Sequence, residues 1–88
     1  MWIEISIKDA SGPWDLLVDA SEIYILNISS CKTSLKIAFK CGHSIIHDFD
    51  ENKTKAQKLR EALIKTILLK TDSILPGIGH IKIIGESL

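Results

Sequence analysis

The 88-residue sequence has few of the features that mark secreted or membrane proteins. Its only two cysteines, Cys31 and Cys41, are too few for the disulfide framework of a small secreted domain, so we interpret them as free thiols. Glu4 stands where a secretory signal would carry positive charge. The longest uncharged stretch of the predicted helix, residues 66–69, is far shorter than the roughly 20 apolar residues of a membrane span. We therefore expect a cytoplasmic protein with no membrane segment.

The chain also lacks net charge and has few aromatic residues. It carries 11 basic and 11 acidic residues, and its aromatic residues are two Trp, one Tyr and two Phe. The charge is unevenly distributed, because residues 1–30 hold five acids against Lys8 alone, whereas residues 31–70 hold nine bases and four acids. This asymmetry is compatible with head-to-tail association or with an anionic partner.

Hydrophobic alternation predicts five short strands in the first half of the chain. Ile3, Ile5 and Ile7 alternate with less apolar residues, which is the period of a strand with one buried face. The turn-forming residues 9–13 then predict a hairpin. The later strands are predicted at residues 14–20, 23–28, 33–40 and 43–49.

The turn between the last two predicted strands indicates how these strands pair. Residues 40–42 are expected to form a three-residue loop whose glycine takes a positive φ. The two flanking strands then place Ile37 opposite Ile45 and Phe39 opposite His43.

An amphipathic helix is predicted at about residues 52–70. Asp48, Asp50 and Asn52 are all candidates for its N-cap. The core-facing positions are expected to be Ala56, Leu59, Leu63, Ile67 and Lys70. The solvated positions are expected to be Thr54, Lys58, Glu61 and Lys65. Past residue 63 the helix becomes apolar nearly all round, so another segment is expected to cover Ile64, Leu68 and Leu69.

The tail is the candidate for that cover. Pro76-Gly77 has the composition of a type II turn, and residues 79–84 read as a sixth short strand. This strand could pair with its own sheet or with that of a neighbouring copy. The sequence thus predicts an α+β fold, with an antiparallel sheet of about five short strands followed by one amphipathic helix. We expect a single domain over residues 1–88, with a strand meander and helix at 1–70 and an extension at 71–88.

No catalytic motif or cofactor fingerprint is present, so we predict neither enzymatic activity nor a cofactor. Cys41, His43 and His47 could converge on one strand face as metal ligands or as a thiol site, but their spacing matches no structural zinc pattern. The acids Asp48, Asp50 and Glu51 are interpreted as helix-capping residues.

The order of signals in residues 1–70 resembles small bacterial proteins of the FlbD type, which are associated with flagellar operons. The likeness rests on the Met-x-Ile-x-Ile start, the segment Asp19-Ala20-Ser21-Glu22-Ile23, the Phe39-Lys40-Cys41-Gly42 turn and a closing helix. The resemblance implies a strand meander followed by a C-terminal helix. The sequence differs from the family at Cys41, because the usual hairpin of the family has asparagine at this position. The resemblance transfers no flagellar role and no catalytic residues to this chain.

Our leading hypothesis is a non-enzymatic module that binds a protein partner or a second copy of itself. Trp2 supports this hypothesis, because its side chain lies on the nominally solvent-exposed face of the first strand. The Trp2 side chain could instead pack beneath the tail or against Trp14. The predicted interface residues are Trp2, Ile64, Leu68, Leu69, Ile81 and Ile83. The alternative is a nucleic-acid-associated or regulatory protein that uses the helix bases Lys53, Lys55, Lys58, Arg60, Lys65 and Lys70. A metal or thiol site at Cys41, His43 and His47 is the third hypothesis.

Overall fold

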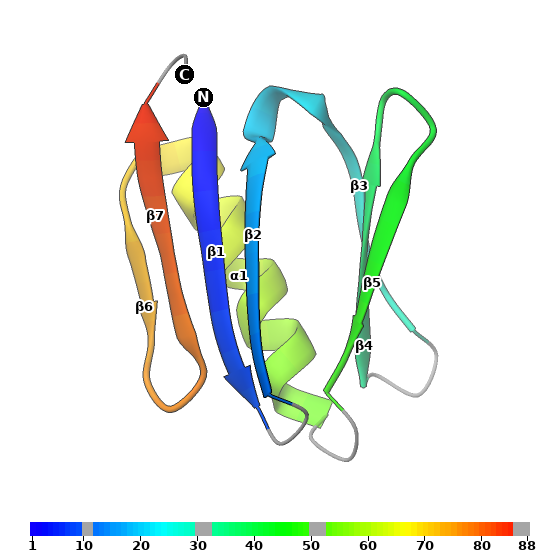
Figure 1. The fold of residues 1–88 in the computed structure, drawn as a ribbon, viewed down its shortest axis with the longest axis vertical. Helices are drawn as coiled ribbons and strands as arrows, with labels where there is room; N and C mark the ends of the chain where they lie inside the picture. The colour runs from blue at the N-terminus through cyan, green and yellow to red at the C-terminus, as the bar shows by residue number, and fades with distance from the viewer. Residues whose placement is uncertain (10–11, 30–32, 50–52, 86–88) are drawn as a thin grey trace. The chain divides into compact units, whose positions relative to one another are not determined.

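Seven strands and one α-helix build the part of the chain that the computed structural model describes, which is residues 1–9, 12–29, 33–49 and 53–85. The elements are β1 (Trp2–Asp9), β2 (Gly12–Asp19), the 3-10 turn η1 (Ala20–Glu22), β3 (Ile23–Ile28), β4 (Ser34–Phe39), β5 (Ser44–Asp48), α1 (Lys53–Leu69), β6 (Ser73–Leu75) and β7 (Gly79–Gly85) (Figure 1). The α+β class and the five strands ahead of the helix are confirmed. All strand pairs are antiparallel, but they form two sheets where the sequence predicted one, and the tail adds two strands where it predicted one.

The chain divides into two compact units. Unit 1 consists of Met1–Ser21 and Ala62–Leu88, and unit 2 consists of Glu22–Glu61. Helix α1 contributes its first half to unit 2 and its second half to unit 1. The strands of the predicted extension at 71–88, β6 and β7, belong to the same sheet as β1 and β2. The expectation of a single domain stays a prediction.

Unit 1 contains a four-stranded sheet in the order β2-β1-β7-β6. The predicted hairpin pairs β1 with β2, and β7 pairs with the other side of β1, so the tail strand lies in its own sheet. Ile5 is opposite Leu16 on β2 and opposite Ile81 on β7. Ile3, Ile5 and Ile7 are fully buried, as their alternation predicts. β1 is therefore the strand around which the core of unit 1 is organised.

The second half of α1 lies behind this sheet in the view of Figure 1. Leu63 is fully buried as predicted, but the next core position is Thr66 rather than Ile67. The Thr66 hydroxyl lies 2.7 Å from the Ser73 hydroxyl, which also donates to the Ala62 carbonyl at 3.4 Å. These bonds satisfy a hydroxyl that would otherwise be costly to bury. The prediction that Lys70 faces the core is wrong, because the helix ends at Leu69 and Lys70 takes a left-handed φ of 52° in an exposed position.

A tight turn joins β6 to β7. The Ile78 N–H donates to the Leu75 carbonyl at 2.9 Å, and Gly77 has a φ of 75°. This is the geometry of a type II turn with glycine at its third position, so the predicted Pro76-Gly77 turn is confirmed.

Unit 2 contains a three-stranded sheet in the order β3-β4-β5. Its register confirms the prediction, because Ile37 is opposite Ile45 and the Phe39 N–H donates to the His43 carbonyl at 2.8 Å. Gly42 takes a φ of 98° in the connecting loop. The buried side chains of this unit come from the sheet and from the first half of α1: Leu35, Ile37, His47, Phe49, Ala56 and Leu59.

Candidate functional site

The most exposed large hydrophobic side chains of unit 1 come from a short stretch that contains the end of α1 and β6. Leu68 is 73% exposed, Leu69 is 64% exposed and Ile74 is 82% exposed. The helix periodicity turns Leu68 and Leu69 away from the buried stripe of Leu63 and Thr66. We call residues 68–74 the helix-end segment.

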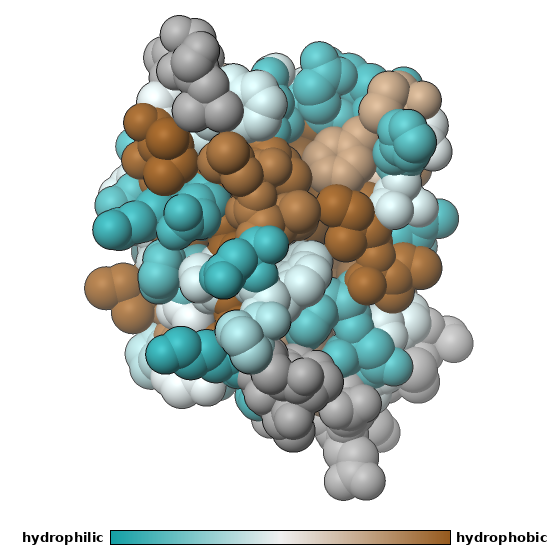
Figure 2. Space-filling view, viewed as in Figure 1, coloured by the Kyte–Doolittle hydropathy of each residue, from teal (hydrophilic) through white to brown (hydrophobic). Residues whose placement is uncertain are grey.

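The outer face of the four-stranded sheet is the other exposed surface of unit 1. The register places Leu17, Glu4 and Lys82 in one row and Asp15, Ser6, His80 and Ile74 in the next. His80 Nε2 lies 3.6 Å from Glu4 Oε1, and the Ser6 hydroxyl donates to Asp15 Oδ1. Figure 2 shows both hydrophobic and hydrophilic side chains on the face that it draws.

A groove of about 710 Å³ is hollowed into unit 1 beside β6. The hairpin residues 72–82 line it together with Ser6 and Lys8 of β1. Asp72 is the only acid among the described residues that line it, and its Oδ1 accepts a hydrogen bond of 2.8 Å from the Ile83 N–H. The volume lies within the range of about 300–1,000 Å³ that is typical of ligand sites.

The predicted interface residues differ in their exposure in the structure. Leu68 and Leu69 are exposed, whereas Trp2, Ile64 and Ile83 are half-buried. Ile81 is fully buried and pairs with Ile5 inside its own sheet, so its side chain belongs to the core of unit 1 and not to a surface.

The suggested packing of Trp2 against Trp14 is wrong. Trp2 is opposite Asp19, whereas Trp14 is opposite Ile7 at the far end of the hairpin. Because neighbouring residues of a strand point to opposite faces, the two indoles lie on opposite faces of the sheet. Trp2 lies beside the tail strand, opposite Gly85.

The three residues of the metal or thiol hypothesis are not assembled. Cys41 and His43 are exposed in and after the turn that precedes β5, and Cys41 is a free thiol. His47 is buried, with its ring centroid 4.4 Å from that of Phe49 in an edge-on contact. No group of three or more His, Cys, Asp or Glu residues within the described ranges could hold a metal ion. Cys31, Asp50 and Glu51 lie outside the described residues, as does Asn52.

The basic residues of α1 whose burial the structure describes differ in exposure. Lys58 and Lys65 are exposed as predicted, but Arg60 is half-buried and its Nε donates to the Leu26 carbonyl at 3.1 Å. This bond attaches α1 to β3 within unit 2. Arg60 therefore has a structural role in the fold.

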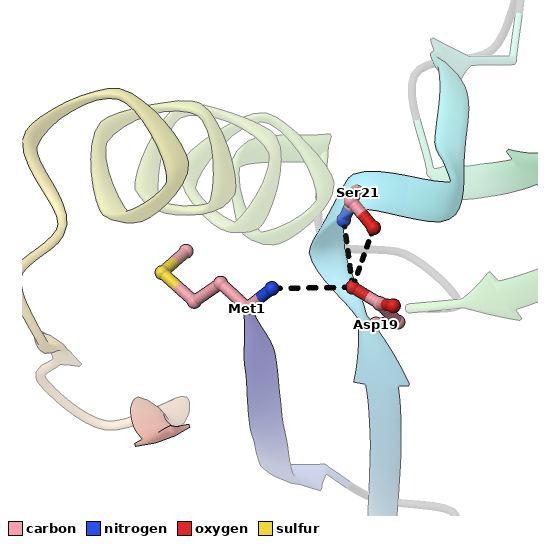
Figure 3. Close-up of polar contacts among 3 residues, drawn as sticks. All are labelled: Met1, Asp19 and Ser21. Carbon is pink, nitrogen blue, oxygen red and sulfur yellow. Dashed lines mark hydrogen bonds and ion pairs between the residues drawn. The ribbon is translucent and has the colours of Figure 1, made fainter. Parts of the chain in front are cut away.

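Asp19 is the centre of a polar cluster in unit 1 (Figure 3). Its Oδ1 accepts hydrogen bonds from the Ser21 hydroxyl at 2.8 Å and the Ser21 N–H at 3.0 Å, and the α-amino group of Met1 lies 3.3 Å away. The hydroxyl of Ser21, then its N–H, hold the pKa of Asp19 below the ordinary value of an aspartate, and the Met1 ammonium acts in the same direction. The cluster caps η1 and ties it to the start of β1.

We expect the Asp19→Asn variant to be less stable than the parent chain near pH 7 and equally stable at low pH. A carboxylate with a depressed pKa stabilises the folded state above its unfolded pKa of about 3.9, and this contribution is lost as the pH falls through the folded-state pKa. Urea unfolding of both proteins between pH 7 and pH 2 measures the difference. A difference that does not change with pH would contradict this account of Asp19, and Ser21→Ala should give a smaller change of the same sign.

Within the described ranges, no helix combines the length and the apolar character that a membrane-spanning segment needs. Comparisons with models of protein families, with curated proteins and with solved structures find no match for this chain. The resemblance to FlbD-type proteins therefore stays a prediction.

Proposed function

We propose that this chain is a small non-enzymatic interaction module that binds a protein partner or a second copy of itself through the helix-end segment. The observation that carries the proposal is the exposure of two consecutive large hydrophobic residues, Leu68 and Leu69, at the end of α1, with Ile74 exposed shortly after them in the chain. Single exposed hydrophobic residues are normal on a protein surface, but several such residues close together mark interaction sites.

The local structure keeps these side chains exposed. Leu63 and Thr66 already occupy the buried stripe of this half of α1, and Ser73 is held by the hydroxyl of Thr66. Leu68 and Leu69 therefore cannot turn inward without breaking the helix periodicity. Covering these two leucines with a partner surface would remove apolar area from water, which favours association.

The test is sedimentation velocity of the full chain over a wide concentration range. Since apolar association is non-directional, we expect the chain to associate at high concentration even when its natural partner is another protein. The Leu68→Ser/Leu69→Ser variant should lose this association and retain the circular dichroism spectrum of the fold. Its expected effect on the free energy of unfolding is small, about 0.5 kcal/mol for each exposed side chain.

Ile46→Ser is the matched control, because Ile46 is 63% exposed but belongs to unit 2. We expect this variant to associate as the parent chain does. A parent chain that stays monomeric up to millimolar concentration, with no change in either variant, would contradict the proposal. Loss of association in Ile46→Ser alone would move the interface to unit 2.

A further inference from the structure

We propose that two copies of this chain pair through their β6 strands, an inference that rests on the proposed function and names both the partner and the contact. β6 is the outermost strand of the four-stranded sheet. At its centre Ile74 is 82% exposed, more than any other large hydrophobic residue in the described part of the chain. A strand at the edge of a sheet offers unpaired backbone groups to another strand. The central residue of β6 therefore combines an exposed apolar side chain with an open sheet edge.

The hydrogen-bond pattern shows that the backbone of Ile74 faces the open side. In an antiparallel sheet, successive residues of a strand direct their N–H and C=O groups to opposite neighbours. The Ile83 N–H points toward the β6 side of β7, because it donates to Asp72 Oδ1. Two residues earlier, Ile81 points the same way, toward its partner Ser73. Ile74 follows Ser73 and so directs its N–H and C=O away from β7, beyond the edge of the sheet.

A second copy of β6 fits this edge in an antiparallel arrangement with two-fold symmetry. When Ile74 lies on the axis, its N–H donates to the Ile74 carbonyl of the other copy, and the other copy donates back. The two Ile74 side chains then stand opposite each other on one face of the joined sheet, within contact distance. Asp72 lies opposite Pro76 of the other copy, so no like charges oppose each other. β6 is thus complementary to itself in hydrogen bonding, apolar contact and charge.

The other edge strand of the same sheet, β2, lacks this property. The Ala20 N–H donates to the Met1 carbonyl, so the even-numbered residues of β2 point toward β1 and Leu17 points outward. Pairing of two β2 strands about Leu17 would place Asp15 opposite Asp19 of the other copy. Like charges directly opposite each other destabilise a strand pair, and acidic side chains are a common protection of sheet edges. β6 has no charged residue and therefore lacks this protection.

The groove beside β6 reaches the edge at which the second strand would lie. Its lining includes all three consecutive residues of β6, although neighbouring side chains of a strand point to opposite faces of the sheet. A groove confined to one face would not be lined by all three residues, so this groove extends along the edge. The chain has 11 acidic and 11 basic residues, so two copies approach each other without long-range repulsion. The edge is accordingly open to a second copy.

The experiment is amide hydrogen exchange of the full chain at increasing concentration, alongside sedimentation velocity. The Ile74 N–H faces solvent in the monomer and is bonded in the pair, so its exchange rate should fall in proportion to the monomer fraction. The Ile46 N–H is the matched control on the edge strand β5 of unit 2. It also points outward, because the Phe39 N–H donates to the His43 carbonyl and the directions alternate along β5. Its exchange rate should not depend on concentration.

Ile74→Pro removes the N–H that the pairing needs. Proline is tolerated on an edge strand where the N–H would face solvent, so the variant should keep the circular dichroism spectrum of the fold. We expect its association to weaken at least about tenfold, because each pair loses two backbone hydrogen bonds. Ile74→Thr keeps the N–H, so it should associate more weakly but retain the concentration-dependent exchange at residue 74. Ile46→Pro should associate as the parent chain does.

The inference is overturned if the parent chain stays monomeric at millimolar concentration, or if it associates with no change in the exchange of Ile74. It is also overturned if folded Ile74→Pro associates fully, or if Ile46→Pro loses association to the same extent. If Ile74→Pro does not fold, the exchange of the parent chain decides. Loss of association in Leu68→Ser/Leu69→Ser with full association in Ile74→Pro would reject β6 pairing and leave the proposed function standing. The opposite pair of results would keep β6 pairing and reject the two leucines as the interface.

Discussion

The Gly79→Ala variant is expected to lose the native structure of unit 1. A Cβ atom built on Gly79 would lie 1.9 Å from the carbonyl oxygen of Ser6 and 2.9 Å from the Cα of Ile7. Both neighbours are backbone atoms of β1, so no side-chain rotation can make room. The variant must separate β7 from β1, which are the two central strands of the sheet.

We expect this change to cost about 4 kcal/mol or more, which puts it among the exceptional single substitutions. A chain of this size has a total stability of about 4 to 13 kcal/mol, so the loss is a large part of the whole. Thermal and urea unfolding followed by circular dichroism measure it, and the amide spectrum reports whether unit 1 keeps its fold.

Gly77→Ala is the matched control in the same hairpin. Gly77 has a φ of 75°, but no heavy atom lies within 4 Å of a Cβ built there. Only the left-handed backbone penalty applies, about 1 to 2 kcal/mol. If Gly79→Ala proves no more destabilising than Gly77→Ala, the close approach of β7 to β1 is refuted.

Much of the local structure was predictable because its causes are local. The alternation of Ile3, Ile5 and Ile7 specifies a strand with one buried face, and the register of Ile37 against Ile45 follows from the length of the loop that contains Gly42. The helix could be predicted from its own periodicity alone. None of these inferences depends on a distant part of the chain.

The arrangement of the strands was not predictable from these patterns. A period of two shows that one face of β1 is buried, but it does not say which strand lies beside β1. The pairing of Ile5 with Ile81 joins residues that are far apart in the sequence, and it leaves no local mark on either strand. This is why the division into two sheets was missed and why Ile81 was assigned to a surface.

The candidate sites show the same limit. The exposure of Leu68 and Leu69 was partly foreseeable, because both residues lie off the apolar stripe of the helix. The tail was expected to cover these two side chains, but both are exposed. Ile74 was missed because β6 has only three residues, too few for an alternation to be recognised. Thr66 was missed because its partner, the Ser73 hydroxyl, is defined only by the fold. The groove depends on the β6–β7 hairpin and had no sequence signal.

The Ile5→Ala variant is expected to lose about 3 to 4 kcal/mol of unfolding free energy, within the usual range for a large aliphatic residue truncated in a core. Ile5 is fully buried and has an aliphatic residue opposite it on each side, Leu16 and Ile81. The cavity is therefore enclosed and cannot collapse easily. Ile5→Val should lose about 0.5 to 1.5 kcal/mol.

Leu17→Ala is the control that tests which face of the hairpin is buried. Leu17 lies on the opposite face of the same hairpin and is 47% exposed, so its truncation should cost less than about 1 kcal/mol. A strand register displaced by one residue would exchange the two faces and reverse the order of these effects. Lys8 and Lys82 lie on the same face as Leu17, so a larger loss from Leu17→Ala than from Ile5→Ala would place both groove lysines inside the core.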